Sequence, residues 1–221
     1  MVMESSKVFL GHKIQVHMEK QTDENKEASQ KTNEKKEGEK IIMGIDPGTQ
    51  VMGYGLIWVQ GKKLSVLQYG VIHLAKYSNH ALKLKKIFER VSQLVEQYAP
   101  DEMALEAPFM GKNVQAALKL GRAQGVAMSA ALVRQIPIAE YAPRKIKQSV
   151  TGNGNASKEQ MAKLLEKQLN FQFQESDPLD ASDALGVALC HYFQGKHGGG
   201  MNKAKSWGDF LKNNPGRIAG K

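Results

Sequence analysis

Residues 41–55 read IIMGIDPGTQVMGYG, in which an apolar run ends at the acid Asp46 and is followed at once by the turn-forming pair Pro47 and Gly48. Such an arrangement is typical of a strand that ends at the edge of a sheet. Three segments share the apolar pattern of strands, and they cover residues 41–45, 53–59 and 64–74. We therefore expect the domain to open with three antiparallel strands.

Beyond residue 74 the pattern alternates between helices and strands. Leucine, isoleucine and valine recur at helical spacing from Leu82 to Val95, and Pro100 ends that helix. The remaining predicted elements are a strand over residues 103–105, a helix over 113–134, a strand over 137–141 and helices over 158–169 and 179–193. This order predicts an α/β domain whose mixed five-stranded sheet is flanked by helices.

The bulk composition favours one globular domain with a polyanionic partner. With 221 residues, 41% of them hydrophobic, the chain can bury one core. Its net charge of +9 and pI near 9.5 favour binding to phosphates, although ribosomal and membrane-surface proteins share this bias. A single cysteine, Cys190, excludes an internal disulfide, and no apolar run reaches the roughly 18 residues of a membrane span or forms a signal peptide. We expect a cytoplasmic protein without membrane attachment, by elimination.

Composition also divides the chain into three parts. Residues 1–40 contain as many lysines as acids and almost nothing apolar after residue 20, which predicts a disordered polar extension. Residues 195–221 are rich in glycine and basic residues, which predicts a flexible cationic tail. The predicted globular domain is the part between them, residues 41–194.

Four acids in this domain lie where a shared site can form. Asp46 and Glu106 each end an apolar strand before a turn breaker, so their carboxylates lie about 5 Å apart if the two strands are neighbours. Asp180 and Asp183 begin the last helix and share one of its faces. Oxygen ligands without nearby His or Cys favour Mg²⁺ or Mn²⁺ over Zn²⁺. Together the acids predict a divalent-metal site that hydrolyses phosphodiester bonds in nucleic acid.

Each acid also has a simpler explanation. Asp46 before Pro-Gly can serve only to stabilise a turn, and Asp180 can interact with the dipole of a helix that Asp177 caps. Asp183 is harder to explain in this way, because its helical neighbours are apolar and an unpaired buried carboxylate is costly. The case for a metal site therefore depends on the joint placement of the four acids.

Three stretches carry a family pattern: IIMGIDPGTQVMGYG at residues 41–55, LEAPFMGKNVQAALKLGRAQGV at 105–126 and DASDALGVALCH at 180–191. In order and spacing they resemble RuvC, the family of bacterial Holliday-junction resolvases. The resemblance covers residues 41–194 and implies an RNase H-like fold and a homodimer. It implies symmetric paired nicking of four-way DNA junctions in recombination and repair, with two Mg²⁺ ions per active site, for which Mn²⁺ can substitute. It also implies contacts with the branch-migration proteins RuvA and RuvB.

The resemblance further implies roles for individual residues. The family's catalytic, metal-binding acids match Asp46, Glu106, Asp180 and Asp183. The implied DNA-binding residues are Phe109, stacked on bases near the junction, Lys147 and Lys158, near the scissile phosphates, and Lys112, Lys119 and Arg122 in the same basic window. Core packing of Phe109 and full solvation of the lysines are the alternatives.

The predicted mechanism places one ion between Asp46 and the last-helix aspartates and the other between Asp46 and Glu106, so that water attack leaves a 3′-hydroxyl and a 5′-phosphate. One rival is the sugar-kinase, Hsp70 and actin group, whose phosphate loop reads much like GIDPGT but which needs two lobes. Tight ATP binding would favour that group. The other rival is a junction- or RNA-binding module that lost catalysis, which would lack one of the acids. The alanine-rich helix over residues 116–131 can serve either as core or as the dimer interface.

Overall fold

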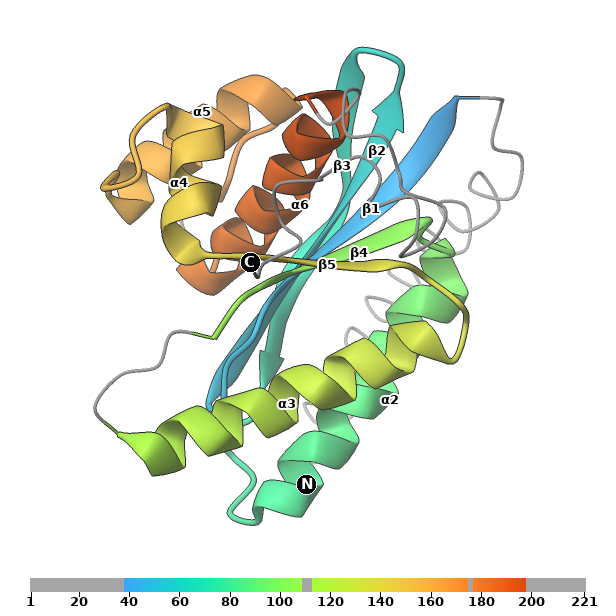
Figure 1. Cartoon of the computed structure of the whole chain (residues 1–221), viewed down its shortest axis with the longest axis vertical. Coiled ribbons are helices and arrows are strands. Elements are labelled where there is room, and N and C mark those ends of the chain that lie inside the picture. The colour runs from blue at the N-terminus through green and yellow to red at the C-terminus, as the bar shows by residue number, and fades with distance from the viewer. Residues whose placement is uncertain (1–37, 109–112, 175–176, 198–221) are drawn as a thin grey trace, which may run out of the picture.

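In the computed structural model, the first predicted strand lies at the centre of the sheet. This strand, β1 (Glu39–Asp46), pairs antiparallel with β2 (Val51–Gln60), which pairs antiparallel with β3 (Lys63–His73). On its other side β1 pairs in parallel with β4 (Glu102–Glu106), and β4 pairs in parallel with β5 (Ile138–Tyr141). The order β3-β2-β1-β4-β5 confirms the predicted mixed five-stranded sheet (Figure 1).

Helices cover both faces of the sheet, so the fold has three layers (Figure 1). One face carries α2 (His80–Tyr98) and α3 (Val114–Leu132). The other face carries α4 (Pro143–Thr151), α5 (Lys158–Leu169) and α6 (Leu179–His197). This is the α/β arrangement that the alternating pattern predicts.

The structure describes residues 38–108, 113–174 and 177–197. Apart from their innermost residues, the predicted polar extension and the predicted basic tail lie outside these ranges, so both remain predictions. The described helices and strands reach slightly beyond the predicted domain, because β1 begins at Glu39 and α6 ends at His197. None of the helices in the described part of the chain combines the length and the apolar character needed to cross a membrane.

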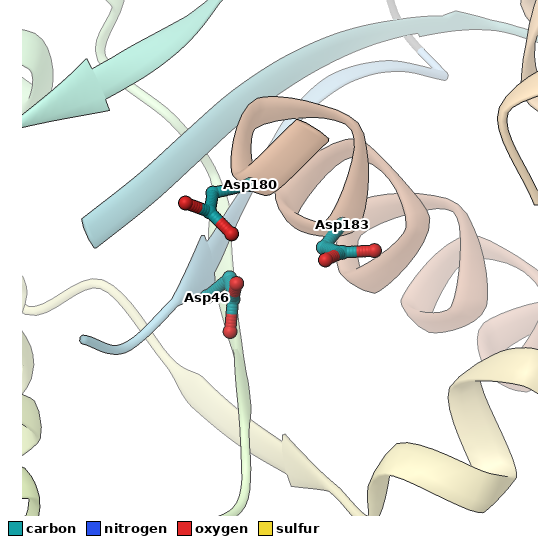
Figure 2. A group of neighbouring side chains, drawn as sticks. All are labelled: Asp46, Asp180 and Asp183. Atoms are coloured by element: carbon teal, nitrogen blue, oxygen red, sulfur yellow. The ribbon is translucent and has the colours of Figure 1, made fainter. Parts of the chain in front are cut away.

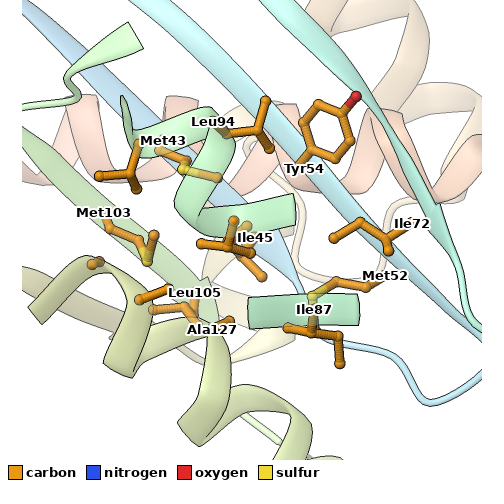
Figure 3. Packing of buried hydrophobic residues seen from close by; sticks show 14 of the residues in the cluster. Met43, Ile45, Met52, Tyr54, Ile72, Ile87, Leu94, Met103, Leu105 and Ala127 are labelled. Carbon is orange, nitrogen blue, oxygen red and sulfur yellow. The ribbon is translucent and has the colours of Figure 1, made fainter. Parts of the chain in front are cut away.

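The larger apolar core lies between the sheet and helices α2 and α3 (Figure 3). Helix α2 begins where the side chain of Asn79 accepts a hydrogen bond from the backbone N–H of Ala81, and it ends at Ala99 in a left-handed conformation. Its buried residues recur every three or four positions, and they are Ile87, Val91, Leu94, Val95 and Tyr98. This helical stripe is the one that the sequence predicts, and it shares one core with residues of β1, β2 and β4.

The second core, beneath the other three helices, includes a helix that the sequence analysis missed. Helix α4 lies between the strand β5 and the loop at Gly152, where the predicted order has no element. Pro143 suits the first turn of a helix, but only Ile146 and Val150 are buried, and two apolar residues are too few to reveal a helical period. Their burial against α5 and α6 stabilises the helix. The predicted order was therefore wrong by one helix.

Helix α6 touches β1 and β2 directly, because glycine occupies the strand positions beneath it. A Cβ atom on Gly44 would lie 2.1 Å from the carbonyl oxygen of Ala184, and one on Gly53 would lie 2.0 Å from that of Asp180. No side chain fits at either separation, so any larger residue would push the helix away from the sheet. The glycines therefore set the distance between α6 and the strands.

The C-terminal half of α6 is held to the sheet by hydrogen bonds. The ring of His191 bonds to the hydroxyl of Tyr141 at 2.7 Å and to the carboxylate of Glu102 at 3.0 Å. Glu102 also accepts a hydrogen bond from Lys40 at 2.7 Å. The bond from His191, with the contribution of Lys40 and against the effect of burial, lowers the pKa of Glu102 to about 2. Helix α6 is thus fixed at both ends.

Gly44→Ala is expected to destabilise the fold by about 1–3 kcal/mol, because the helix backbone must move away from the strand. Urea unfolding followed by circular dichroism measures the change. Gly121→Ala is the matched control, since an added Cβ on this α3 residue meets nothing within 4 Å. We expect the control to gain up to about 1 kcal/mol from helix propensity. A Gly44→Ala protein as stable as the control would contradict the role of this contact.

Candidate metal centre

Asp46 and Glu106 lie side by side at the ends of neighbouring strands. The parallel register pairs Ile45 of β1 with Leu105 of β4, and each acid follows one member of this pair. Ile45 and Leu105 both belong to the core beneath α2 and α3, and side chains alternate along a strand. Both carboxylates therefore point to the face that α6 covers.

The first turns of α6 bring two further aspartates to this point. One carboxylate oxygen from each of Asp46, Asp180 and Asp183 lies within 4.8 Å of the other two (Figure 2). Gly53 pairs with Asp46 across β1 and β2, and its missing side chain lets the backbone of Asp180 rest on the strand. The close approach of α6 is therefore what joins acids from opposite ends of the domain sequence.

Glu106 stands slightly apart from these aspartates. Within the described ranges, the acids that gather to within 4.8 Å are the three aspartates, without Glu106. Burial, and then the negative charge of Asp183, raises the pKa of Glu106, while Lys158 and Lys147 oppose the rise. Glu106 is therefore close enough to share the electrostatic environment of the group.

The pKa of Asp46 shows that placing these acids together disfavours their charged form. Burial, followed by the charges of neighbouring acids, raises its pKa from 3.8 to about 8, against an opposing effect of Lys158. The neighbouring acids, in decreasing order of effect, are Glu106, Asp183 and Asp180. The site resists a full set of negative charges near neutral pH, and a cation among the carboxylates would relieve the repulsion.

The donor set fits a hard divalent cation. Carboxylate oxygens bind Mg²⁺ at about 2.0–2.1 Å and Ca²⁺ at about 2.3–2.6 Å, so two ligands of one ion lie at most roughly 4–5 Å apart. The oxygens of Asp46, Asp180 and Asp183 lie within 4.8 Å of one another, a bound that satisfies the limit for Ca²⁺ and exceeds the limit of about 4.2 Å for Mg²⁺, so the group would close slightly around Mg²⁺. These residues offer oxygen alone, which Mg²⁺ and Mn²⁺ accept and which is a poor match for soft metals.

Two of the predicted DNA-binding lysines lie beside the acids. Lys158, the first residue of α5, donates a hydrogen bond to Asp183 at 2.6 Å and lies 3.6 Å from Asp180. Lys147 of α4 is half-buried, and its charge opposes the rise in the pKa of Glu106. Both lysines therefore approach the acids from the helices on the α6 side of the sheet.

The other predicted DNA-binding residues are placed differently. Lys119 and Arg122 are exposed on α3, on the opposite face of the sheet. Burial lowers the pKa of His80 at the start of α2, and the nearby charges of Arg122 and Lys119 lower it further. His80, Lys119 and Arg122 therefore form a second basic group, separate from the lysines beside the acids. Phe109 and Lys112 lie outside the described residues.

The structure adds two contacts that the sequence analysis missed. Lys83 of α2 donates to the carbonyl oxygen of Thr49 at 3.0 Å and so holds the loop that follows Asp46. Tyr69 of β3 donates to the carboxylate of Asp177 at 2.5 Å, which ties the segment before α6 to the sheet. The sequence predicts Asp177 only as a helix cap. Both contacts join segments far apart in the chain, so no local pattern reveals them.

The family model and the curated relatives that match the chain carry the same description. Residues 42–191 match the family model described as crossover junction endodeoxyribonuclease RuvC. The protein of that name from Cytophaga hutchinsonii is 61% identical over 187 residues, which cover 84% of this chain and 92% of the relative. Its counterpart from Porphyromonas gingivalis is 53% identical over 186 residues, which cover 81% of this chain and 97% of the relative.

Solved structures share the fold. RuvC from Thermus thermophilus in complex with a Holliday junction substrate superposes with a TM-score of 0.67 at 29% identity, covering 72% of this chain and 96% of that one. The yeast mitochondrial Holliday junction resolvase has a TM-score of 0.52 at 14% identity, covering 71% of this chain and 82% of that one, and shows likeness of fold alone. The RNase H-like architecture is therefore confirmed.

Asp46→Asn is expected to raise the melting temperature in EDTA at about pH 8 by roughly 2–8 °C, because an amide cannot carry the charge that the site disfavours. The folded carboxyl group keeps its proton up to a pH of about 8, whereas the unfolded one loses it near 3.8. The stability that this proton contributes is complete below that lower value and is lost as the pH rises to about 8. Thermal melts between pH 3.8 and about 8 should show that the difference in melting temperature between the variant and the wild type widens as the pH rises.

Glu89→Gln removes a partly exposed acid of α2 and serves as the control, for which no widening is expected. A gap of constant size across the pH series would contradict the electrostatic account of Asp46.

Proposed function

Because the chain belongs to the RuvC family of crossover junction endodeoxyribonucleases, we propose that it resolves Holliday junctions in homologous recombination and DNA repair. The observation that carries this proposal is the convergence of Asp46, Asp180 and Asp183 from two distant segments. A binding module that had lost catalysis would have no need for so costly a group of acids. The Holliday junction substrate of the Thermus thermophilus relative supports the choice of DNA structure.

In this proposal the acids hold two Mg²⁺ ions, for which Mn²⁺ can substitute. Asp46 would be shared between the ions, with Asp180 and Asp183 completing one set of ligands and Glu106 the other. The position of Glu106 just outside the aspartate group supports this division. When bound, such ions activate a water molecule and stabilise the leaving oxygen of a phosphodiester, which gives a 5′-phosphate.

The basic residues would bind and orient the DNA. Lys147 and Lys158 lie beside the acids, so their ammonium groups can hold the scissile phosphate and offset the charge that develops on it. Lys119 and Arg122 would contact phosphates farther along the junction arms. Phe109 would stack on bases near the crossover, and Lys112 would bind the backbone, as the family resemblance implies.

A homodimer would match the two-fold symmetry of a four-way junction, because two equivalent sites can nick two strands symmetrically. Helix α3 has features that suit both core packing and a dimer interface, the two roles that its sequence leaves open. Its alanines pack into the core, and the buried ones are Ala123, Ala127, Ala130 and Ala131. Its first half also exposes Val114 and Leu118, and the neighbouring α2 exposes Leu82 and Phe88. We assign the dimer interface to this apolar surface.

Contacts with RuvA and RuvB and a cytoplasmic location come from the family resemblance and the composition. The same holds for the division of the chain into a polar extension, a nuclease domain and a basic tail. All of these remain proposals.

A synthetic four-way junction tests the proposed function directly. With Mg²⁺ we expect symmetric nicks with 5′-phosphates, and with EDTA no nicks, as read from end-labelled strands on denaturing gels. Asp46→Asn is expected to reduce cleavage at least about 100-fold and to keep junction affinity within about threefold, because affinity comes mainly from cationic contacts.

Linear duplex is the substrate control, and Glu89→Gln is the protein control. Cleavage that persists in EDTA, equal cutting of linear duplex, or robust cutting by Asp46→Asn would contradict the proposal. Tight ATP binding would favour the sugar-kinase, Hsp70 and actin group instead.

Leu118→Glu is expected to convert the dimer into a monomer, because it places a charge in the proposed apolar interface. Light scattering coupled to size-exclusion chromatography measures the mass. Leu132→Glu is the matched control on the same helix, since Leu132 is similarly exposed, 54% against 51% for Leu118. A Leu118→Glu protein that stays dimeric would place the interface elsewhere.

A further inference from the structure

Lys158 places a positive charge inside the proposed metal centre. Its Nζ atom lies 2.6 Å from Oδ2 of Asp183 and 3.6 Å from Oδ1 of Asp180. Its charge also opposes the rise in the pKa of Asp46 that burial and the neighbouring acids cause. The ammonium group is therefore a counter-ion of the acidic group as well as a candidate DNA contact.

A divalent ion would need the same oxygens. An ion bound to Asp46, Asp180 and Asp183 would lie among carboxylate oxygens that are within 4.8 Å of one another. The ammonium group already occupies an oxygen of Asp183, and two cations held by one carboxylate repel each other. Binding of the ion and the contact of Lys158 with Asp183 are therefore in competition.

The backbone of Lys158 is fixed, whereas its side chain is flexible and half exposed. Ser157 caps α5, and Gln160 completes a capping box with it, so the first turn of the helix is well defined. The side chain of Lys158 is 47% exposed and has a flexible four-carbon stem. The ammonium group can thus leave the aspartates for a phosphate without any change in the fold.

We propose that Lys158 is a displaceable counter-ion that neutralises Asp180 and Asp183 before metal binds, competes with the incoming ion, and then moves its contact to the scissile phosphate. This inference rests on the proposed nuclease function of the same site. Lys158 then weakens ion binding in the DNA-free protein. Junction DNA offers the ammonium group another partner, so DNA and metal bind cooperatively.

Lys158→Met tests the competition, because methionine keeps an unbranched side chain and removes the charge. Mn²⁺ binding to the full chain without DNA is measured by isothermal titration calorimetry and by electron paramagnetic resonance of the free ion. We expect the variant to bind Mn²⁺ about fivefold more tightly or better. Its junction cleavage should fall, since the phosphate loses a cationic contact. A merely structural role would not move these two measurements in opposite directions.

Two matched variants separate the contact from the general charge. Lys163→Met makes the same charge change farther along α5 and should leave Mn²⁺ affinity within about twofold. Lys147→Met removes the charge that acts on Glu106 and should tighten Mn²⁺ binding less than Lys158→Met does. Circular dichroism checks folding, and Lys158→Gln is a second neutral variant for which tighter binding is again expected.

Equal or weaker Mn²⁺ binding by both neutral variants of Lys158 would overturn the inference. The proposed function would survive that result if the wild-type protein binds Mn²⁺ and cuts junctions. Absence of Mn²⁺ binding to the wild-type protein, or unchanged binding to Asp183→Asn, would refute the metal centre and the inference with it.

Discussion

The direct contact between the backbone of α6 and strands β1 and β2 is the constraint on which the proposed metal centre depends. Gly44 and Gly53 leave no side chain between helix and strand, and the aspartates of α6 reach Asp46 only at that separation. At the other end, the hydrogen bonds of His191 keep the helix from sliding along the sheet. A helix seated on larger side chains would carry the same acids too far from β1 to share an ion.

The electrostatic cost of the site follows from this contact. Bringing half-buried acids together raises the pKa of Asp46 to about 8, so the centre subtracts from the stability of the fold until a cation enters. Stability therefore has to come from the two apolar cores on either side of the sheet. Lys158 offsets part of the repulsion, and its exposed side chain keeps that compensation reversible.

The edge of the sheet explains how one small domain can combine acids with a polyanionic substrate. Strands β1 and β4 end side by side, so their terminal acids are partly open to solvent while the strands behind them stay buried. Lysines reach the acids from α4 and α5, and a second basic group lies on α3 across the sheet. This arrangement suits a substrate whose phosphates pass around the edge, as the proposed function requires.

The sequence by itself determined the strands of the sheet, most of the helices and the four candidate acids, because strand ends, turn breakers and apolar periods are local signals. It also determined the family, because three separate motifs occur in the right order. Only the tertiary structure decided that α4 exists, that Glu106 stands apart from the aspartates, and that Lys83, Tyr69 and Lys158 make the contacts described. A local pattern shows which way a side chain points, but the distance between two elements depends on packing between residues far apart in the chain.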